Sequence, residues 1–384
     1  MILHDPYSNM ETGAIGGEDN LVHREIIALR TIGQQVFVCN FQISGFKRKL
    51  HQLRAQLFGS NRNLLKLIKV INPDIILCHN LQQSSGYKWM KKVKIPIVMS
   101  LHNYRLFCSI SIAWRDGKTC IECNNGNFLK VFKYNCGDYK AKLNAVRKIL
   151  FRQPERKIPK LYLSASNLVK SQHQNFVKKA NFYTLGSLPN LEDLKATTLS
   201  DKKSGFIFAG RIEMEKGILE LVDVWPEDID LDIYGNGTQI KELELKIRTK
   251  RYIRLFDSFN PSDTQILRKY KALIFPSLWM EGSPLIVTEA IACGTPVITT
   301  NLNSASELIM NAGAGVIIKD INRTEILRAI NDVELNQSKY SKNAKEFAHK
   351  HLIYPIWGNK LKSELEKVLF ESDQESQFAN SEIV

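Results

Sequence analysis

The fold of the second half of the chain is decided by the stretch Phe275–Val297, FPSLWMEGSPLIVTEAIACGTPV. The apolar run Ala272–Pro276 predicts a buried strand, and Leu285–Cys293 predicts a helix that Gly294 ends. A further strand is predicted at Pro296–Thr299. Because strand, helix and strand follow one another, this stretch predicts a parallel α/β unit.

Two carboxylates of this stretch lie where a ligand would bind. Glu281 precedes the predicted helix, and Glu289 lies about one turn inside it. Ligands of doubly wound sheets bind at the carboxyl ends of the strands, near helix N-termini that offer unpaired N–H groups. We therefore expect both carboxylates in one cleft, with a phosphate near the helix start. A loop glutamate and a surface glutamate are the alternative, and the spacing alone does not exclude it.

A loop with two cations lies upstream, in Ala209–Gly217, AGRIEMEKG. It joins a predicted strand, Gly205–Ala209, to a predicted helix, Gly217–Val224. Arg211 and Lys216 are therefore expected at the carboxyl edge of the sheet. Arginine can bind a diphosphate through two N–H groups and lysine as a point charge. In isolation, the pair is equally compatible with a solvated surface.

The first half shows the same alternation of short strands and helices. Strands are predicted at Ile2–His4, Gln35–Asn40, Asp74–His79 and Ile95–Leu101, and helices at Asn20–Gly33 and Leu64–Val70. Such alternation is typical of parallel sheets covered by helices. We therefore predict an α/β protein with two Rossmann-like, doubly wound domains that face each other across a cleft.

The expected domains are 1–190, 191–355 and a C-terminal segment, 356–384. A linker is predicted at 189–204, and a strand at Leu231–Tyr234 follows it in the second domain. The C-terminal segment combines an amphipathic helix, Trp357–Phe370, with a frayed tail.

Two features of the first half are weaker signals. Gly16 and Gly17 follow the first strand and would let the backbone approach a ligand closely. His102 follows the strand that ends at Leu101, a place that suits a ligand cleft. A histidine there is as often a hydrogen-bonded structural residue.

The charge is divided unevenly between the halves. Residues 1–190 hold 29 Lys and Arg against 10 Asp and Glu, and the remainder holds 24 against 29. The basic half favours an anionic partner, namely a nucleic acid, an anionic membrane or a phosphorylated acceptor, over a merely solvated surface. No apolar run reaches the roughly 18 residues of a membrane span, and the N-terminus carries no signal-peptide pattern, so a cytoplasmic protein is expected.

Four of the seven cysteines, Cys108, Cys120, Cys123 and Cys136, lie within one loop of the first domain, 108–136. Four thiols can form a tetrahedral zinc site, and a metal would hold a long loop with little core. The set contains one CxxC pair, where many zinc sites contain two. We predict structural zinc, with reduced thiols and a redox function as alternatives.

These motifs together resemble glycosyltransferase family 4, the retaining group with the GT-B fold. The resemblance is carried by GGEDNLVHREIIALRTIGQQVFV, SLHNYRLFC, RDGKTCIEC, LSASNLVKSQ, LPN, FAGRIEMEKGI, YGNGT and FPSLWMEGSPLIVTEAIACGTPVITT, which span Gly16 to about Thr300 in the family's order. The final helix is similar to the segment that crosses back to the first domain. Asn103 and Leu191 depart from the residues that many relatives carry, Asp and Gly.

The resemblance implies an enzyme that transfers a hexose from a nucleotide-sugar bound by the second domain to a saccharide or lipid-linked acceptor bound by the first. By this resemblance, Arg211 and Lys216 hold the donor diphosphate, and Gly16 and Gly17 approach it. Glu289 binds the ribose, and Glu281 and His102 contact the transferred sugar. Backbone groups for the sugar and phosphate come from Ser283, Pro284 and Leu285. No cofactor is implied for catalysis, because the two cations can stabilise the leaving group without a metal. The implied pathway is bacterial surface polysaccharide or lipopolysaccharide synthesis, with peripheral contact to the inner face of an anionic membrane.

Two other functions compete with this one. A GT-B epimerase or phosphorylase would keep the fold and change the chemistry. A basic, zinc-containing nucleic-acid-binding protein would leave the Arg211–Lys216 loop and the two glutamates without a role, so we expect no nucleic-acid partner. The sequence does not identify the sugar, the base, the acceptor, the linkage or the oligomeric state.

Overall fold

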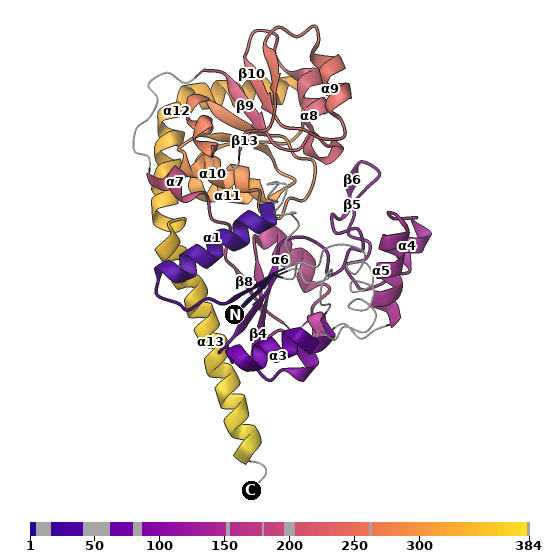
Figure 1. The fold of residues 1–384 in the computed structure, drawn as a ribbon. Helices are drawn as coiled ribbons and strands as arrows, with labels where there is room; N and C mark the ends of the chain where they lie inside the picture. Colours follow the sequence, from indigo (N-terminus) through magenta and orange to yellow (C-terminus); the bar gives the residue numbers. More distant parts are fainter. Residues whose placement is uncertain are drawn as a thin grey trace. The chain divides into compact units, whose positions relative to one another are not determined.

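Each half of the chain forms its own parallel six-stranded sheet in the computed structural model (Figure 1). The structure describes residues 1–4, 17–40, 62–79, 87–150, 154–178, 180–195, 204–260 and 263–381. The chain divides into two units: the first comprises Met1–Ala113, Ile121–Gly186 and Trp357–Val384, and the second comprises Trp114–Cys120 and Ser187–Ile356. The predicted α/β class and its two doubly wound sheets are confirmed.

The first unit contains a sheet of strand order β2-β1-β3-β4-β7-β8. Its strands are β1 (Ile2–His4), β2 (Val38–Asn40), β3 (Ile76–Cys78), β4 (Ile97–Leu101), β7 (Leu161–Ser164) and β8 (Asn181–Thr184). Its helices include α1 (Gly17–Thr31), α3 (Arg62–Ile71), α4 (Lys130–Lys133), α5 (Tyr139–Leu150) and α6 (Asn167–Gln174). Ile2 pairs with Val38 on one side and with Leu77 on the other, so the very short first strand lies inside the sheet.

The second unit contains a sheet of strand order β11-β10-β9-β12-β13-β14. Its strands are β9 (Phe206–Ala209), β10 (Leu231–Tyr234), β11 (Ile253–Phe256), β12 (Ala272–Phe275), β13 (Val297–Thr300) and β14 (Gly315–Ile318). Its helices are α7 (Leu191–Lys195), α8 (Ile218–Val224), α9 (Ile240–Ile247), α10 (Leu285–Ala292), α11 (Ser304–Ala312) and α12 (Arg323–His351), as far as this part of the chain is described.

Apolar side chains cover both faces of this second sheet. Along β9, Phe206 and Phe208 belong to one hydrophobic cluster, while Ile207 and Ala209 belong to another. Successive side chains of a strand point to opposite faces, so the sheet is buried on both sides. This explains why its strands are continuous apolar runs rather than alternating ones.

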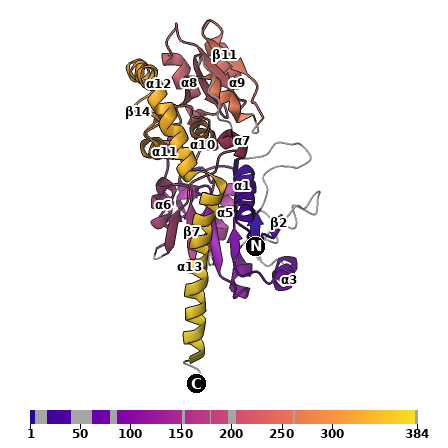
Figure 2. The same cartoon turned by 90° about the vertical axis from the view of Figure 1, so that its left-hand side faces the viewer.

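The C-terminal helix α13 (Tyr354–Ser381) packs on the first unit from Trp357 onwards (Figure 2). Trp357 Nε1 donates a hydrogen bond to the Gly186 carbonyl over 3.4 Å. At Gly358 the helix lies so close to α1 that an added Cβ would stand 2.8 Å from the Ala28 carbonyl oxygen. The glycine therefore permits the close approach of the two helices.

Several boundaries differ from the sequence prediction. The helix α7 lies inside the predicted linker, and α13 continues to Ser381 through most of the predicted frayed tail. A hairpin of β5 (Trp114–Arg115) and β6 (Lys118–Thr119) groups with the second unit although its sequence lies in the first half. No helix within the described ranges is long and apolar enough to cross a membrane.

Candidate active site

The strand order of the second sheet places two loops side by side. Numbered along the chain within this unit, its strands follow the order 3-2-1-4-5-6, so the direction of winding reverses between β9 and β12. Ligands of open α/β sheets bind at this switch point, beyond the carboxyl ends of the strands. The loop after β9 carries Arg211 and Lys216, and the loop after β12 carries Glu281. The structure therefore brings together both motifs of the second half.

Lys216 and Glu281 form an ion pair at this edge, between Nζ and Oε1. Their side chains are only 13% and 9% exposed. The Ser277 hydroxyl donates to the same carboxylate oxygen over 3.2 Å, and Lys216 Nζ lies 5.3 Å from the centre of the Trp279 ring. Glu281 therefore neutralises the lysine charge, and an incoming phosphate would compete with it for the ammonium group.

Arg211 lies in the same loop but points toward solvent. Its side chain is 57% exposed, and its guanidinium contacts Glu215 at 2.8 Å and Glu213 at 4.0 Å. The backbone carbonyl of Glu215 accepts a hydrogen bond from Leu278 N (3.0 Å) and lies 3.2 Å from the Ser277 hydroxyl, which shares its one proton between this carbonyl and Glu281; these contacts join the two loops. Its two acidic partners are half-buried, and an exposed arginine can exchange such partners for a diphosphate at little cost.

Two glycines allow the loops to approach each other. Gly217 has φ +68°, and an added Cβ would stand 2.3 Å from the Pro276 carbonyl oxygen. An added Cβ on Gly235, at the end of β10, would stand 1.9 Å from the Gly210 carbonyl oxygen. Neither distance is compatible with a side chain, so both positions require glycine.

The helix α10 begins at Leu285, as predicted, with Pro284 as its N-terminal cap. Glu289 lies one turn inside the helix and is buried, with 5% of its surface exposed. Ser283, Pro284 and Leu285 are half-buried where the helix begins. The first turn of a helix carries N–H groups that have no partner within the helix, so this start is suited to bind an anion.

The first unit holds the remaining predicted residues. Gly17 is the first residue of α1, and Gly16 lies outside the described residues. His102 follows β4, and its Nε2 lies 2.7 Å from Nδ1 of His79, which follows β3. His79 Nε2 in turn lies 3.3 Å from Glu25 Oε2 of α1. His79 is not among the predicted site residues, although it is the last residue of a predicted strand, Asp74–His79, and so lies at the same edge as His102.

The structure gives the predicted zinc site no support. Within the described ranges, which include Cys108, Cys120, Cys123 and Cys136, no three His, Cys, Asp or Glu side chains are grouped so as to hold a metal ion. Burial raises the pKa of the Cys108 thiol. Structural zinc stays a prediction, which elemental analysis of protein purified without chelator would test.

Three aspartates of the second unit have a spacing that is also found in metal sites, Asp228-x-Asp230-x-Asp232. Asp232 accepts hydrogen bonds from Arg254 Nε over 2.6 Å and from the Tyr270 hydroxyl over 2.7 Å. This carboxylate is thus engaged within the sheet, away from the loops after β9 and β12.

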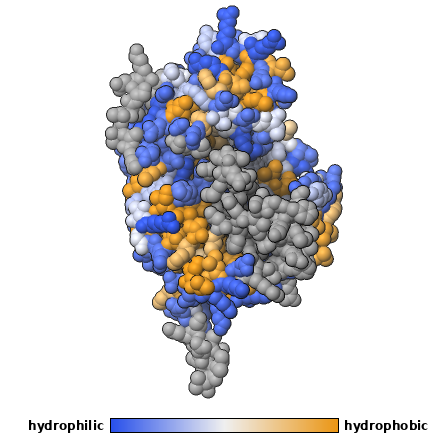
Figure 3. All heavy atoms as spheres, viewed as in Figure 1, coloured by the Kyte–Doolittle hydropathy of each residue, from blue (hydrophilic) through white to orange (hydrophobic). Residues whose placement is uncertain are grey.

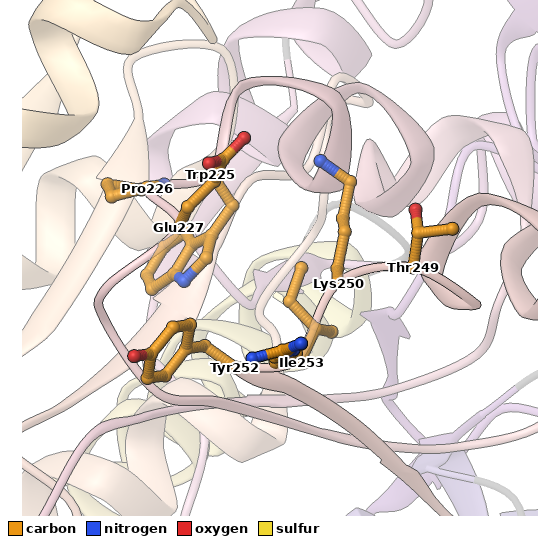
Figure 4. A pocket seen from close by; sticks show the side chains of 8 residues that line it. Trp225, Pro226, Glu227, Thr249, Lys250, Tyr252 and Ile253 are labelled. Atoms are coloured by element: carbon orange, nitrogen blue, oxygen red, sulfur yellow. The ribbon is translucent and has the colours of Figure 1, made fainter.

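A cavity lies at the opposite edge of the second sheet. It has a volume of about 330 Å³ and is lined by residues that follow α8 or precede β11. Figure 4 shows the rings of Trp225 and Tyr252 on one side and Lys250 and Thr249 on the other. Because this is the amino edge of the strands, we do not assign the cavity to the candidate active site.

Part of the chain matches a known protein family and several curated proteins. Residues 190–351 match the family "Glycosyl transferases group 1". An Escherichia coli relative, "UDP-Gal:alpha-D-GlcNAc-diphosphoundecaprenol alpha-1,3-galactosyltransferase", is 28% identical over 173 residues, which are 40% of this chain and 44% of that protein. An uncharacterized 42.6 kDa protein in the cps region of Klebsiella pneumoniae is 25% identical over 269 residues, 67% of this chain and 65% of that protein.

Solved structures match the whole fold. Anabaena HepE in complex with UDP superposes with a TM-score of 0.64 at 15% identity, covering 95% of this chain and 99% of HepE. WaaG, a glycosyltransferase involved in lipopolysaccharide biosynthesis, superposes with a TM-score of 0.61 at 13% identity, covering 94% of this chain and 98% of WaaG. The sequence alignments, by contrast, span less than half the length of some curated relatives.

Proposed function

We propose that this chain, which matches the group 1 glycosyltransferases over residues 190–351 and has the GT-B fold, is a member of that family. It would transfer a hexose, with retention of configuration, from a nucleotide-sugar to a saccharide or lipid-linked acceptor. The observation that carries the proposal is the pairing of Lys216 with Glu281 at the switch point of the second sheet. Lys216 and Arg211 would bind the diphosphate there, beside the first turn of α10.

A uridine diphosphate sugar is the proposed donor. The Escherichia coli relative is named for UDP-Gal, and HepE is described in complex with UDP and with UDP-glucose. In this chain, the buried carboxylate of Glu289 would accept hydrogen bonds from the ribose hydroxyls. Once Lys216 turns to the phosphate, Glu281 would accept hydrogen bonds from the hydroxyls of the transferred sugar.

The chemistry requires no nucleophile from the protein. The bond between the sugar C1 and the diphosphate oxygen breaks, the acceptor oxygen bonds to C1 on the same face, and the acceptor proton passes to the leaving diphosphate. The diphosphate gains negative charge as this bond breaks. Lys216 and Arg211 would stabilise that charge in the transition state, which is where such interactions accelerate a reaction.

A donor screen tests this function. We expect UDP-sugars to raise the melting temperature of the protein, and GDP-, ADP- and CMP-sugars not to. We also expect release of UDP with transfer to added lipid-linked or saccharide acceptors. Product analysis without an acceptor separates transfer from epimerisation, and replacement of the acceptor by inorganic phosphate tests for a phosphorylase. The proposal would be contradicted if RNA or DNA raised the melting temperature and no UDP-sugar did.

We also propose that the first unit binds an anionic membrane, through α5 and the neighbouring α4. Besides Ile149, which is 45% exposed, α5 has four exposed apolar side chains, at 73%, 42%, 37% and 69% of their surface: Tyr139, Leu143, Val146 and Leu150. At 100° per residue they lie within about 60° of one another, so they form one stripe. Figure 3 shows apolar side chains at the outer edge that α4 and α5 occupy in Figure 1.

Cations flank this stripe on both sides. Lys142 lies to one side of it on the helix, and Lys140 and Arg147 lie to the other. The opposite face of α5, with Ala141 and Ala145, is buried against the first unit. An apolar stripe between cations matches the boundary of an anionic bilayer, where the stripe enters the acyl region and the cations reach the phosphates.

Sedimentation with vesicles tests the membrane contact. We expect binding to phosphatidylglycerol vesicles that falls steeply with salt and is weak on phosphatidylcholine vesicles. Leu143→Glu with Leu150→Glu should reduce binding at least tenfold. Val70→Glu, on α3, replaces a side chain that is 83% exposed and serves as the matched control. Binding that the α5 substitutions leave unchanged, or self-association that they abolish, would contradict this proposal.

A further inference from the structure

Three residues from separate elements of the first unit form a chain of ionisable groups, of which two are buried and His102 is half-buried. Glu25 lies on α1, His79 follows β3 and His102 follows β4. Glu25 is 4% exposed and His79 is fully buried. The ring planes of the two histidines lie within 16° of each other, with His79 Nδ1 2.7 Å from His102 Nε2.

The second contact of the chain joins His79 to Glu25. Glu25 Oε2 lies 3.3 Å from His79 Nε2, which is an ion-pair distance, although the two atoms are not aligned as a hydrogen bond in this structure. A neutral imidazole carries one proton, so one of its nitrogens donates and the other accepts. Whichever role His79 Nε2 takes toward Glu25, His79 Nδ1 takes the opposite role toward His102.

We propose that Glu25 and His79 are positioning residues that determine which nitrogen of His102 carries its proton. With Glu25 protonated, its hydroxyl donates to His79 Nε2, and His79 Nδ1–H donates to His102 Nε2. His102 then carries its own proton on Nδ1. With Glu25 ionised, both bonds reverse: His79 Nε2–H donates to Glu25, and His102 Nε2–H donates to His79 Nδ1. His102 Nδ1 is then an acceptor.

The two states differ by one proton, and the proton balance is complete. On ionisation, the Glu25 proton moves to His79 Nε2, the His79 Nδ1 proton moves to His102 Nε2, and the His102 Nδ1 proton leaves to solvent. Ionisation of the buried Glu25 carboxyl group thus releases a proton to solvent from Nδ1 of His102. His102 is only half-buried, so it can exchange a proton with solvent, and it lines a small cavity of about 10 Å³ with Tyr87 and Arg105.

The surroundings of Glu25 place this change near neutral pH. Burial raises the pKa of Glu25 from 4.5 to about 8. The negative charge of Glu18, two turns earlier on α1, contributes to this rise as the second cause. Among the described residues, the titratable or charged groups that face Glu25 and its neighbours from other elements include His79, His102 and, at the cavity, Arg105. The helix α13, which packs on α1 at Ala28, presents the uncharged Gly358 there.

The consequence for the reaction rests on the proposed function, in which His102 contacts the transferred sugar. Below about pH 8, His102 would offer that sugar a donor, and above it an acceptor. A sugar hydroxyl accommodates both, but a carbonyl or ring oxygen only accepts a hydrogen bond. Glu25 would therefore make turnover pH-dependent although it does not touch the substrate.

Long-range ¹H–¹⁵N spectra of ¹⁵N-histidine-labelled protein test the proposal without any substrate. The eight histidines are few enough to resolve, and His102→Ala identifies the signals of His102. We expect the His102 pattern to change from Nδ1–H to Nε2–H between pH 7 and 9.5, with a midpoint near 8. In Glu25→Gln, which does not titrate, the pattern should stay constant, and in Glu18→Gln the midpoint should fall.

Glu155→Gln is the matched control, because Glu155 is a buried carboxyl group of the same unit with a raised pKa and lies beside Arg147 instead of His79. Its substitution should leave the midpoint of His102 in place. A wild-type pattern that stays constant over this pH range, or the same transition in folded Glu25→Gln, would overturn the proposal. Because the spectra need no donor, they remain decisive even if the proposed sugar transfer is not observed.

Discussion

Substitution of Lys216 by alanine should affect both turnover and stability, and the structure separates the two effects. The ammonium group would stabilise the leaving diphosphate, and loss of one such donor typically costs about 3 kcal/mol, or roughly a hundredfold in turnover. The same substitution leaves Glu281, which is 7% exposed, without its cation.

The cost in stability follows from the burial of the pair. Removing one partner of a fully buried ion pair costs about 3–5 kcal/mol, and an exposed pair contributes about 0–1 kcal/mol. Glu281 keeps the Ser277 hydroxyl as a hydrogen-bond donor and can also take up a proton. We therefore expect Lys216→Ala to lower the stability of the second unit by about 2–3 kcal/mol. Glu281→Gln in the same background should restore part of the stability and none of the turnover.

Arg211→Ala is the matched control for folding. Its guanidinium is 57% exposed, so the lost contact with Glu215 should lower stability by less than about 1 kcal/mol. Turnover should still fall by a similar factor, because Arg211 would bind the same diphosphate. UDP release at saturating donor measures turnover, and calorimetry measures stability. If both single variants keep near wild-type turnover, the leaving-group mechanism is wrong.

Three further substitutions give separate predictions. Glu289→Gln should raise the donor KM with little change in kcat, because ribose contacts are the same in the ground and transition states; a large fall in kcat would contradict this role. Gly217→Ala should destabilise the second unit by at least about 1–2 kcal/mol, the cost of a left-handed conformation, and calorimetry would detect it. Glu25→Gln should flatten the dependence of stability on pH between 4.5 and 8. In that range the folded wild-type protein binds a proton on Glu25 that the unfolded state lacks, so its stability falls as pH rises. An equally steep decline in the variant would show that Glu25 is not the cause.

Much of the fold is present in the local pattern of the sequence. Continuous apolar runs predicted β9, β10 and β12 to within a residue, because a strand buried on both faces has no polar alternation. The helix α10 begins at the predicted Leu285, directly after Pro284, which is its N-terminal cap. Chain order alone then placed Arg211, Lys216 and Glu281 in loops that follow strands. Their family roles remain proposals.

The tertiary structure decided which of these loops meet. The sequence does not state that β9 lies beside β12 rather than beside β13, yet this neighbour relation brings Lys216 to Glu281 across 65 residues of chain. In the same way, Glu25 meets His79 only because α1 packs beside the end of β3. Periodicity reports which face of an element is buried, and it carries no information about which element buries it. Strand order is chosen by the packing of all elements at once, so contacts between distant residues are properties of the folded chain.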